Sequence, residues 1–191
     1  MIDYVDIAKF FILKDYEYGI DRIDEINIQK LLYSSHAVHL ALSNKPLVEG
    51  EFQAWRCGPV YPPLYKFYTQ FVMGQLPLPT PDEIERIESP VRLLLEIIWD
   101  YIGKHHLYKL NTLDPKDFPW RKARKGLLSN IGSFNPISVE DIKTLGKQIC
   151  QQIKELNEIE EKSVITDLIQ KEFSQETKTE ASLLNILKDS L

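Results

Sequence analysis

Four histidines and two cysteines are the side chains of this chain whose arrangement is worth considering for a zinc site or for nucleophilic catalysis. His36 and His39 stand three residues apart, so on a helix they would share one face and could bind the same zinc ion. Cys57, or the pair His105 and His106, could complete such a site. The spacing lacks the glutamate of the helical zinc-protease motif and the chain has no Cys-x-x-Cys pair, so packed or solvent-facing histidines are the favoured interpretation.

Cys57 near any of the histidines is the one arrangement that could support nucleophilic catalysis, which needs a nucleophile, a base and an orienting group. The residues around Cys57 do not resemble the signature of a cysteine hydrolase. The sequence also has no glycine-rich phosphate loop of the Walker or dinucleotide-binding type. We therefore predict no catalytic residue, no metal and no cofactor, and we keep a metal-dependent or cysteine-dependent enzyme as a minor alternative.

A cluster of basic and aromatic residues is the third candidate for chemistry. It consists of Lys116, Phe118, Trp120, Arg121, Lys122, Arg124 and Lys125. Such a cluster could contact the phosphates of a nucleic acid or the acidic surface of a protein. A solvated helix face is the simpler interpretation.

The composition is that of a water-soluble globular protein with one core. The chain has 191 residues, of which 43% are hydrophobic and 27% charged. We expect neither export nor a membrane span, because the N-terminus lacks the pattern of a secretory signal and Arg92, Glu96 and Asp100 interrupt the longest apolar stretch. The expected location is the cytoplasm, where Cys57 and Cys150 would remain thiols.

The negative charge is concentrated near the C-terminus. Residues 1–150 hold 18 Lys and Arg against 19 Asp and Glu, whereas residues 151–191 hold 5 against 9. This distribution differs from the broad basic footprint of proteins that bind duplex DNA, so a nucleic-acid partner is not expected.

The spacing of apolar residues predicts a mainly α-helical domain of about six helices over residues 1–154. The predicted helices cover residues 4–18, 27–43, 64–71, 81–102, 118–126 and 137–156. Ser89-Pro90 should restart or kink the fourth helix. Near residues 47–60 we expect a small β-hairpin or extended arm, which Gly58-Pro59 should end because proline has no N–H to donate.

Residues 155–191 are predicted to form an acidic amphipathic helical extension. Ile165, Leu168, Ile169 and Phe173 recur at helical spacing, and so do Leu183, Leu184, Ile186 and Leu187. The apolar side of this extension could lie in a groove of a partner or of a second copy of the chain, or it could pack on its own domain. Both alternatives stay open, and homo-oligomers are one consequence of the first.

Four motifs in a fixed order resemble the signature of the Panacea-domain family, a bacterial and phage module that includes SocA-like antitoxins and proteolytic adaptors. They are Gln29–Tyr33, Ala54–Val60, Tyr65 and Pro119–Trp120, and the resemblance covers most of residues 1–150 but not residues 155–191. The residues of these motifs that we interpret as structural are Lys30, Tyr33, Trp55, Gly58, Pro59, Val60 and Trp120.

The resemblance implies an antitoxin that neutralises a cognate toxin by direct binding, or an adaptor that delivers the toxin to a protease or its unfoldase. It implies no enzymatic activity. Aromatic and arginine side chains are enriched at the centres of protein interfaces. The residues expected to bind the partner are therefore Arg56, Tyr61, Tyr65, Arg121, Lys122 and Arg124. The alternative function is a phage or prophage regulator that binds nucleic acid through residues 116–125.

Overall fold

The fold is mainly α-helical with one small hairpin, as the sequence predicts. The computed structural model describes residues 2–19, 23–71, 78–103, 118–128 and 130–159. Within these ranges the elements are α1 (Tyr4–Glu17), α2 (Glu25–Ser43), β1 (Gln53–Trp55), β2 (Gly58–Val60), α3 (Pro62–Tyr68), α4 (Pro81–Glu85), α5 (Ser89–Ile98), the π-helical segment η2 (Trp99–Gly103), α7 (Phe118–Ala123) and α8 (Val139–Ile159). The expected helices after residue 160 lie outside the described residues.

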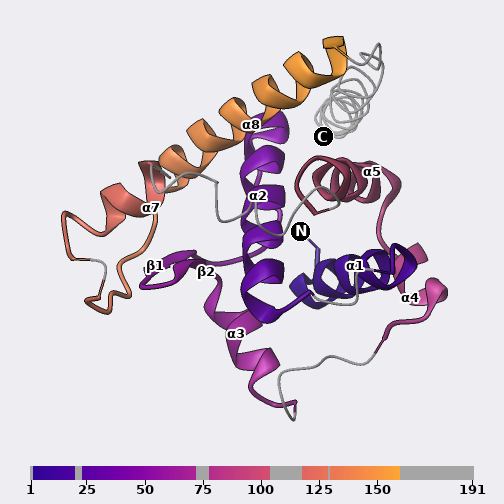
Figure 1. Ribbon diagram of the computed structural model, residues 1–191, viewed down its shortest axis with the longest axis horizontal. Helices are drawn as coiled ribbons and strands as arrows, with labels where there is room; N and C mark the ends of the chain where they lie inside the picture. The colour runs from indigo at the N-terminus through magenta and orange to yellow at the C-terminus, as the bar shows by residue number, and fades with distance from the viewer. Residues whose placement is uncertain (1, 20–22, 72–77, 104–117, 129, 160–191) are drawn as a thin grey trace, which may run out of the picture.

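Helix α2 runs through the centre of the molecule (Figure 1). Helix α8 crosses one end of α2, α1 and α5 lie on one side of it, and the β1–β2 hairpin lies on the other (Figure 1). Every residue from Leu31 to Leu40 is buried, including polar side chains such as Ser34 and Ser35. A helix that is buried on all faces needs partners on every side, and the other elements are arranged accordingly.

Helices α2 and α8 touch through their backbones. Gly146 of α8 faces α2 so closely that a Cβ atom at this position would lie 1.9 Å from the carbonyl oxygen of Ala37 and 3.0 Å from the Cβ of Ala41. Small residues on both helices thus set the distance between the two axes. On either side of Gly146, the side chains of Ile142 and Ile149 are buried in the core.

Several predicted helix ends are confirmed. Gly19 follows α1 with a φ of 66°, and Asn44 ends α2 with a φ of 59°, the left-handed conformation typical of a helix C-terminus. Thr80 and Glu83 form a capping box at α4, where the predicted fourth helix begins, and the backbone N–H of Thr80 donates to the Glu83 carboxylate at 2.9 Å. The predicted helix over residues 81–102 is divided into α4, α5 and η2, with Pro90 in the first turn of α5.

The hairpin continues through Pro59, contrary to the expectation that this proline would end it. Strands β1 and β2 are antiparallel, and Pro59 lies opposite Ala54. The backbone N–H of Ala54 is turned away from β2 and donates to the carbonyl oxygen of Asn135 at 2.8 Å. The Ala54–Pro59 pair therefore makes no hydrogen bonds across the hairpin, so the N–H that proline lacks is not needed there.

A buried glutamine attaches the end of the hairpin to α2. The side-chain oxygen of Gln29 accepts the backbone N–H of Tyr61 at 2.8 Å, and its side-chain nitrogen donates to the Tyr61 carbonyl oxygen at 3.3 Å. An amide side chain offers one acceptor and two donors, so it can satisfy both backbone groups of one residue. This pair fixes where α3 begins relative to α2.

Among the described residues, no helix combines the length and the apolar character that a membrane crossing requires.

We predict that Gly146→Ala lowers the free energy of unfolding by about 1–3 kcal/mol, because the added methyl group must force α8 away from the Ala37 backbone. Urea denaturation followed by circular dichroism measures this difference. The matched control is Gly132→Ala, since a Cβ atom at position 132 would have no neighbour within 4 Å. Equal unfolding midpoints for the two variants would show that the close approach is not a constraint.

Candidate partner-binding surface

Three aromatic side chains from three separate segments form a row on the hairpin side of the molecule. The ring of Trp55 in β1 lies 4.8 Å from that of Tyr65 in α3 and 5.3 Å from that of Phe134, measured between centroids. Both contacts are edge-to-face, an arrangement that aromatic pairs prefer. Phe134 is nevertheless 69% exposed and Tyr65 39% exposed. The row therefore leaves much of its apolar area in contact with water.

The loop that follows α7 adds aliphatic side chains to this row. Lys125 and Gly126 adopt left-handed conformations, with φ values of 51° and 79°, and reverse the direction of the chain after α7. The same loop carries three further exposed apolar residues, Leu127, Leu128 and Ile131. Together with Trp55, Tyr65 and Phe134 they form what we call the aromatic surface. Several large apolar side chains exposed on neighbouring segments are typical of an interaction site.

Arg124 holds the loop against the hairpin. Its side chain is only 2% exposed, and its guanidinium group donates to the carbonyl oxygens of Ala54 at 3.4 Å, Leu128 at 2.9 Å and Ile131 at 2.7 Å. The guanidinium carbon also lies 5.0 Å from the centroid of the Trp120 ring. A guanidinium group offers several donors in a fixed plane, so one arginine can bind several carbonyl groups at once.

Two further side chains connect α7 to β1 and to the segment before α8. The indole N–H of Trp120 donates to the carbonyl oxygen of Trp55 at 2.8 Å. The side-chain amide of Asn135 donates to the backbone carbonyl oxygen of Ala123 at 2.9 Å. The backbone N–H of Ile137 donates to the Phe52 carbonyl oxygen at 2.8 Å. The segment just before α8 therefore pairs with the free side of β1, and the aromatic surface rests on a fixed backbone.

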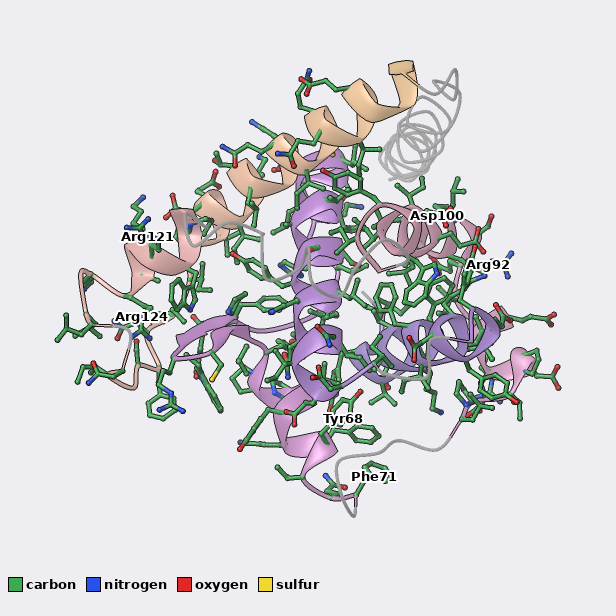
Figure 2. All side chains as sticks on the ribbon, in the orientation of Figure 1. Tyr68, Phe71, Arg92, Asp100, Arg121 and Arg124 are labelled. Atoms are coloured by element: carbon green, nitrogen blue, oxygen red, sulfur yellow. The ribbon has the colours of Figure 1, made fainter. Side chains whose placement is uncertain are left out.

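The two segments that carry the aromatic surface are positively charged. Residues 52–71 and 118–139 contain six Lys and Arg and no Asp or Glu, although the whole chain has a net charge of −5. Arg56, Lys66, Arg121, Lys122 and Lys125 are exposed. Figure 2 shows Arg121 and Arg124 on the hairpin side of the molecule, opposite Arg92 and Asp100.

The structure separates the residues that we expected to bind a partner into two groups. Arg56, Tyr65, Arg121 and Lys122 are exposed around the aromatic surface, and Lys122 forms an ion pair with Asp141 at 2.8 Å. The other two expected residues are Tyr61 and Arg124.

Tyr61 and Arg124 are buried, which corrects the expectation that they contact a partner directly. The hydroxyl group of Tyr61 donates to the Glu49 carbonyl oxygen, and burial raises the pKa of Tyr61 to about 12. The polar groups of both side chains are occupied by backbone carbonyl groups of their own chain. Both residues support the aromatic surface from the interior of the protein.

Phe134 and the three aliphatic residues of the loop were missed by reasoning from sequence. They lie in a stretch with glycine, serine and asparagine, which reads as an ordinary loop. The signal that could have found them is the number of large apolar residues between Gly126 and Pro136, together with the absence of acidic residues there.

The motif residues on α2 and β2 are buried or partly buried. The ring of Tyr33 is buried with its centroid 5.2 Å from that of Phe52, and burial of Lys30 lowers the pKa of its amino group. Gly58 has a φ of 134°, which a residue with a side chain rarely adopts. Pro59 and Val60 complete the partly buried strand β2. Trp55 and Trp120 are half-buried, so each packs on one side and leaves the other accessible.

The two histidines of α2 are both buried. The ring of His36 lies 5.0 Å from that of Phe52, and burial lowers the pKa of His36 to about 4, with a smaller effect of His39. The Nδ1 atom of His39 lies 2.8 Å from the Lys45 carbonyl oxygen, and burial lowers the pKa of His39 as well.

Cys57 is exposed at the hairpin turn. No three His, Cys, Asp or Glu side chains of the described residues could share a metal ion, and His105 and His106 lie outside those residues.

Comparisons with known proteins relate most of the chain to one family. The sequence model of the family described as "Antitoxin SocA-like, Panacea domain" matches residues 28–188, so the match includes the C-terminal extension that the motifs alone had left out. Antitoxin SocA of Caulobacter vibrioides (strain NA1000 / CB15N) is 43% identical over 47 residues, which are 25% of this chain and 25% of that protein. The chain thus matches about a quarter of the length of this curated relative. No significant match was found among solved structures.

We predict that Arg124→Met destabilises the protein by about 2–4 kcal/mol, because the carbonyl oxygens of Ala54 and Ile131 lose their donor and that of Leu128 keeps only the backbone N–H of Ile131. Chemical denaturation measures the loss, and hydrogen exchange at Ala54 and Ile131 reports whether the loop detaches. The control is Arg121→Met on the exposed side of α7, which should change stability by less than about 0.5 kcal/mol. An Arg124→Met variant as stable as this control would contradict the role of Arg124.

We also predict that stability depends on pH through His36. The native pKa of about 4 lies below the ordinary value of 6.5, so the unfolded state binds more protons between these two pH values. The stabilisation is complete above pH 6.5 and decreases as the pH falls toward 4, by up to about 3 kcal/mol. Urea denaturation at pH 7, 6 and 5 measures the slope, which His36→Gln should reduce, while His39 contributes the remainder. An unchanged slope in His36→Gln would contradict the prediction.

Proposed function

Because the chain belongs to the family described as "Antitoxin SocA-like, Panacea domain", we propose that it is an antitoxin that neutralises a partner toxin by direct protein–protein binding. The family match over residues 28–188 is the observation that carries this proposal. The name of the curated relative, Antitoxin SocA, indicates the same role.

The aromatic surface supports binding as the mode of action. It displays tryptophan, tyrosine and phenylalanine side chains near arginines, the residue types enriched at the centres of protein interfaces. Its loop is already fixed by Arg124, so little conformational entropy is lost when a partner binds. In this proposal the protein acts stoichiometrically, in the cytoplasm where its toxin is made, and has no catalytic residue of its own.

Neutralisation has two forms within this proposal. In sequestration, the bound toxin persists as an inactive complex. In delivery, the antitoxin presents the toxin to a protease or its unfoldase, and the amount of toxin falls. The two forms share the binding step and differ in the fate of the toxin.

We predict that co-expression of this chain with the toxic protein encoded beside it restores growth, whereas the toxin alone arrests it. Affinity purification of the tagged chain should recover the toxin in a fixed stoichiometry, and light scattering then gives the composition of the complex. The amount of toxin after synthesis is stopped distinguishes the two forms, since delivery requires its loss and sequestration does not. Growth arrest that persists at full expression of the chain, with no toxin recovered, would contradict the proposal.

A further inference from the structure

We infer that the aromatic surface binds an acidic segment of the partner toxin, in which Asp or Glu side chains flank apolar anchors. This inference rests on the proposed function and adds to it the place of contact and the chemistry of the partner. It follows from the charge, the exposed apolar area and the rigidity of one face of the molecule.

Most of the cations around the aromatic surface are available to a partner, although Lys122 is paired with Asp141. Among the described residues, Arg56, Lys66, Arg121 and Lys125 make no ion pair, and the segments that carry them have no Asp or Glu. Elsewhere the pattern is different, since Lys9 pairs with Glu83 on the opposite side of α2. In a chain with a net charge of −5, such a local concentration of unpaired cations favours an anionic partner and repels a second basic surface.

The apolar part of the surface provides anchors for a protein side chain. Phe134 and Leu128 are 69% and 71% exposed, and the ring of Trp55 packs edge-to-face against both Phe134 and Tyr65. Aromatic side chains lose little entropy on binding because they have two rotatable bonds. Apolar residues of the partner would displace water from this centre, and its carboxylates would meet the cations at the rim.

A protein partner fits these residues better than a nucleic acid does. The loop of the aromatic surface exposes the aliphatic side chains of Leu127, Leu128 and Ile131, which offer neither charge for phosphates nor planar faces for stacking with bases. The net negative charge of the chain also opposes approach to a polyanion. An acidic segment with apolar anchors satisfies both parts of the surface.

The test uses the full-length chain and the toxin identified by co-expression rescue. Titration calorimetry measures the Kd of variants at exposed positions, which should fold normally: Phe134→Ser with Leu128→Ser removes the apolar centre, and Arg121→Glu with Lys125→Glu reverses the rim charge. Each pair should weaken binding by at least about tenfold. The matched controls are Tyr16→Ser on α1 and Lys147→Glu on α8, both exposed and outside the aromatic surface, and they should change Kd by less than about twofold.

Salt dependence gives a second readout that a loss of folding would not produce. Raising the ionic strength should weaken binding of the unchanged chain more than that of the Arg121→Glu, Lys125→Glu variant, because fewer favourable charge contacts remain to be screened in the variant. Unfolding midpoints of all variants, measured by circular dichroism, show that the scaffold is intact. Changing acidic residues of the toxin to Lys should restore binding to the charge-reversed variant.

The outcomes separate this inference from the proposed function. If the unchanged chain rescues growth and all surface variants bind the toxin as tightly as the controls do, the inference is wrong and the antitoxin role stands. If a single-stranded RNA competes with the toxin for the unchanged chain but not for the charge-reversed variant, the surface belongs to a nucleic acid and the inference is wrong. If the unchanged chain neither rescues nor binds, both proposals fail.

Discussion

The contact between the backbones of α2 and α8 is the constraint on which the rest of the structure depends. Gly146 has no side chain to separate the helices, so α8 lies directly on Ala37. The start of α8 is thereby placed beside the hairpin, where Ile137 can donate its backbone N–H to Phe52, just before β1. Because α7 and its loop immediately precede this point, they are brought to the hairpin as well (Figure 1). A packing contact in the core thus determines which segments form a surface at some distance from it.

Once these segments meet, buried polar side chains determine their arrangement. Gln29 satisfies both backbone groups of Tyr61, and Arg124 donates to the carbonyl groups of Ala54, Leu128 and Ile131. Losing one of these side chains would leave several backbone groups unpaired, which is costly away from water. The same interactions keep Phe134 and its neighbours exposed, since a loop fixed at its backbone cannot turn its apolar side chains inward.

Local features of the fold could be predicted from sequence, whereas the contacts that build the surface could not. Helix ends such as Asn44 and Thr80 depend on residues a few positions apart, so their patterns are readable in the chain. The bond between Gln29 and Tyr61 joins residues 32 positions apart, and that between Arg124 and Ala54 joins residues 70 apart. A glutamine or an arginine in a sequence does not indicate a buried side chain that bonds to distant backbone groups, because both residue types are far more common on the surface. The aromatic and basic character of the candidate site was visible in sequence, but which of its members are exposed depends on the tertiary fold.

The proline in β2 has a consequence for how other chains can associate with this one. A short exposed strand is ordinarily a template to which a foreign strand can add, with the risk of uncontrolled self-association. Pro59 is the middle residue of a three-residue strand, and at this position the side of β2 turned away from β1 has no hydrogen to offer. Sheet extension is therefore blocked at its midpoint. Association near the hairpin is thus favoured through side chains, a mode that discriminates between partners far better than generic backbone pairing.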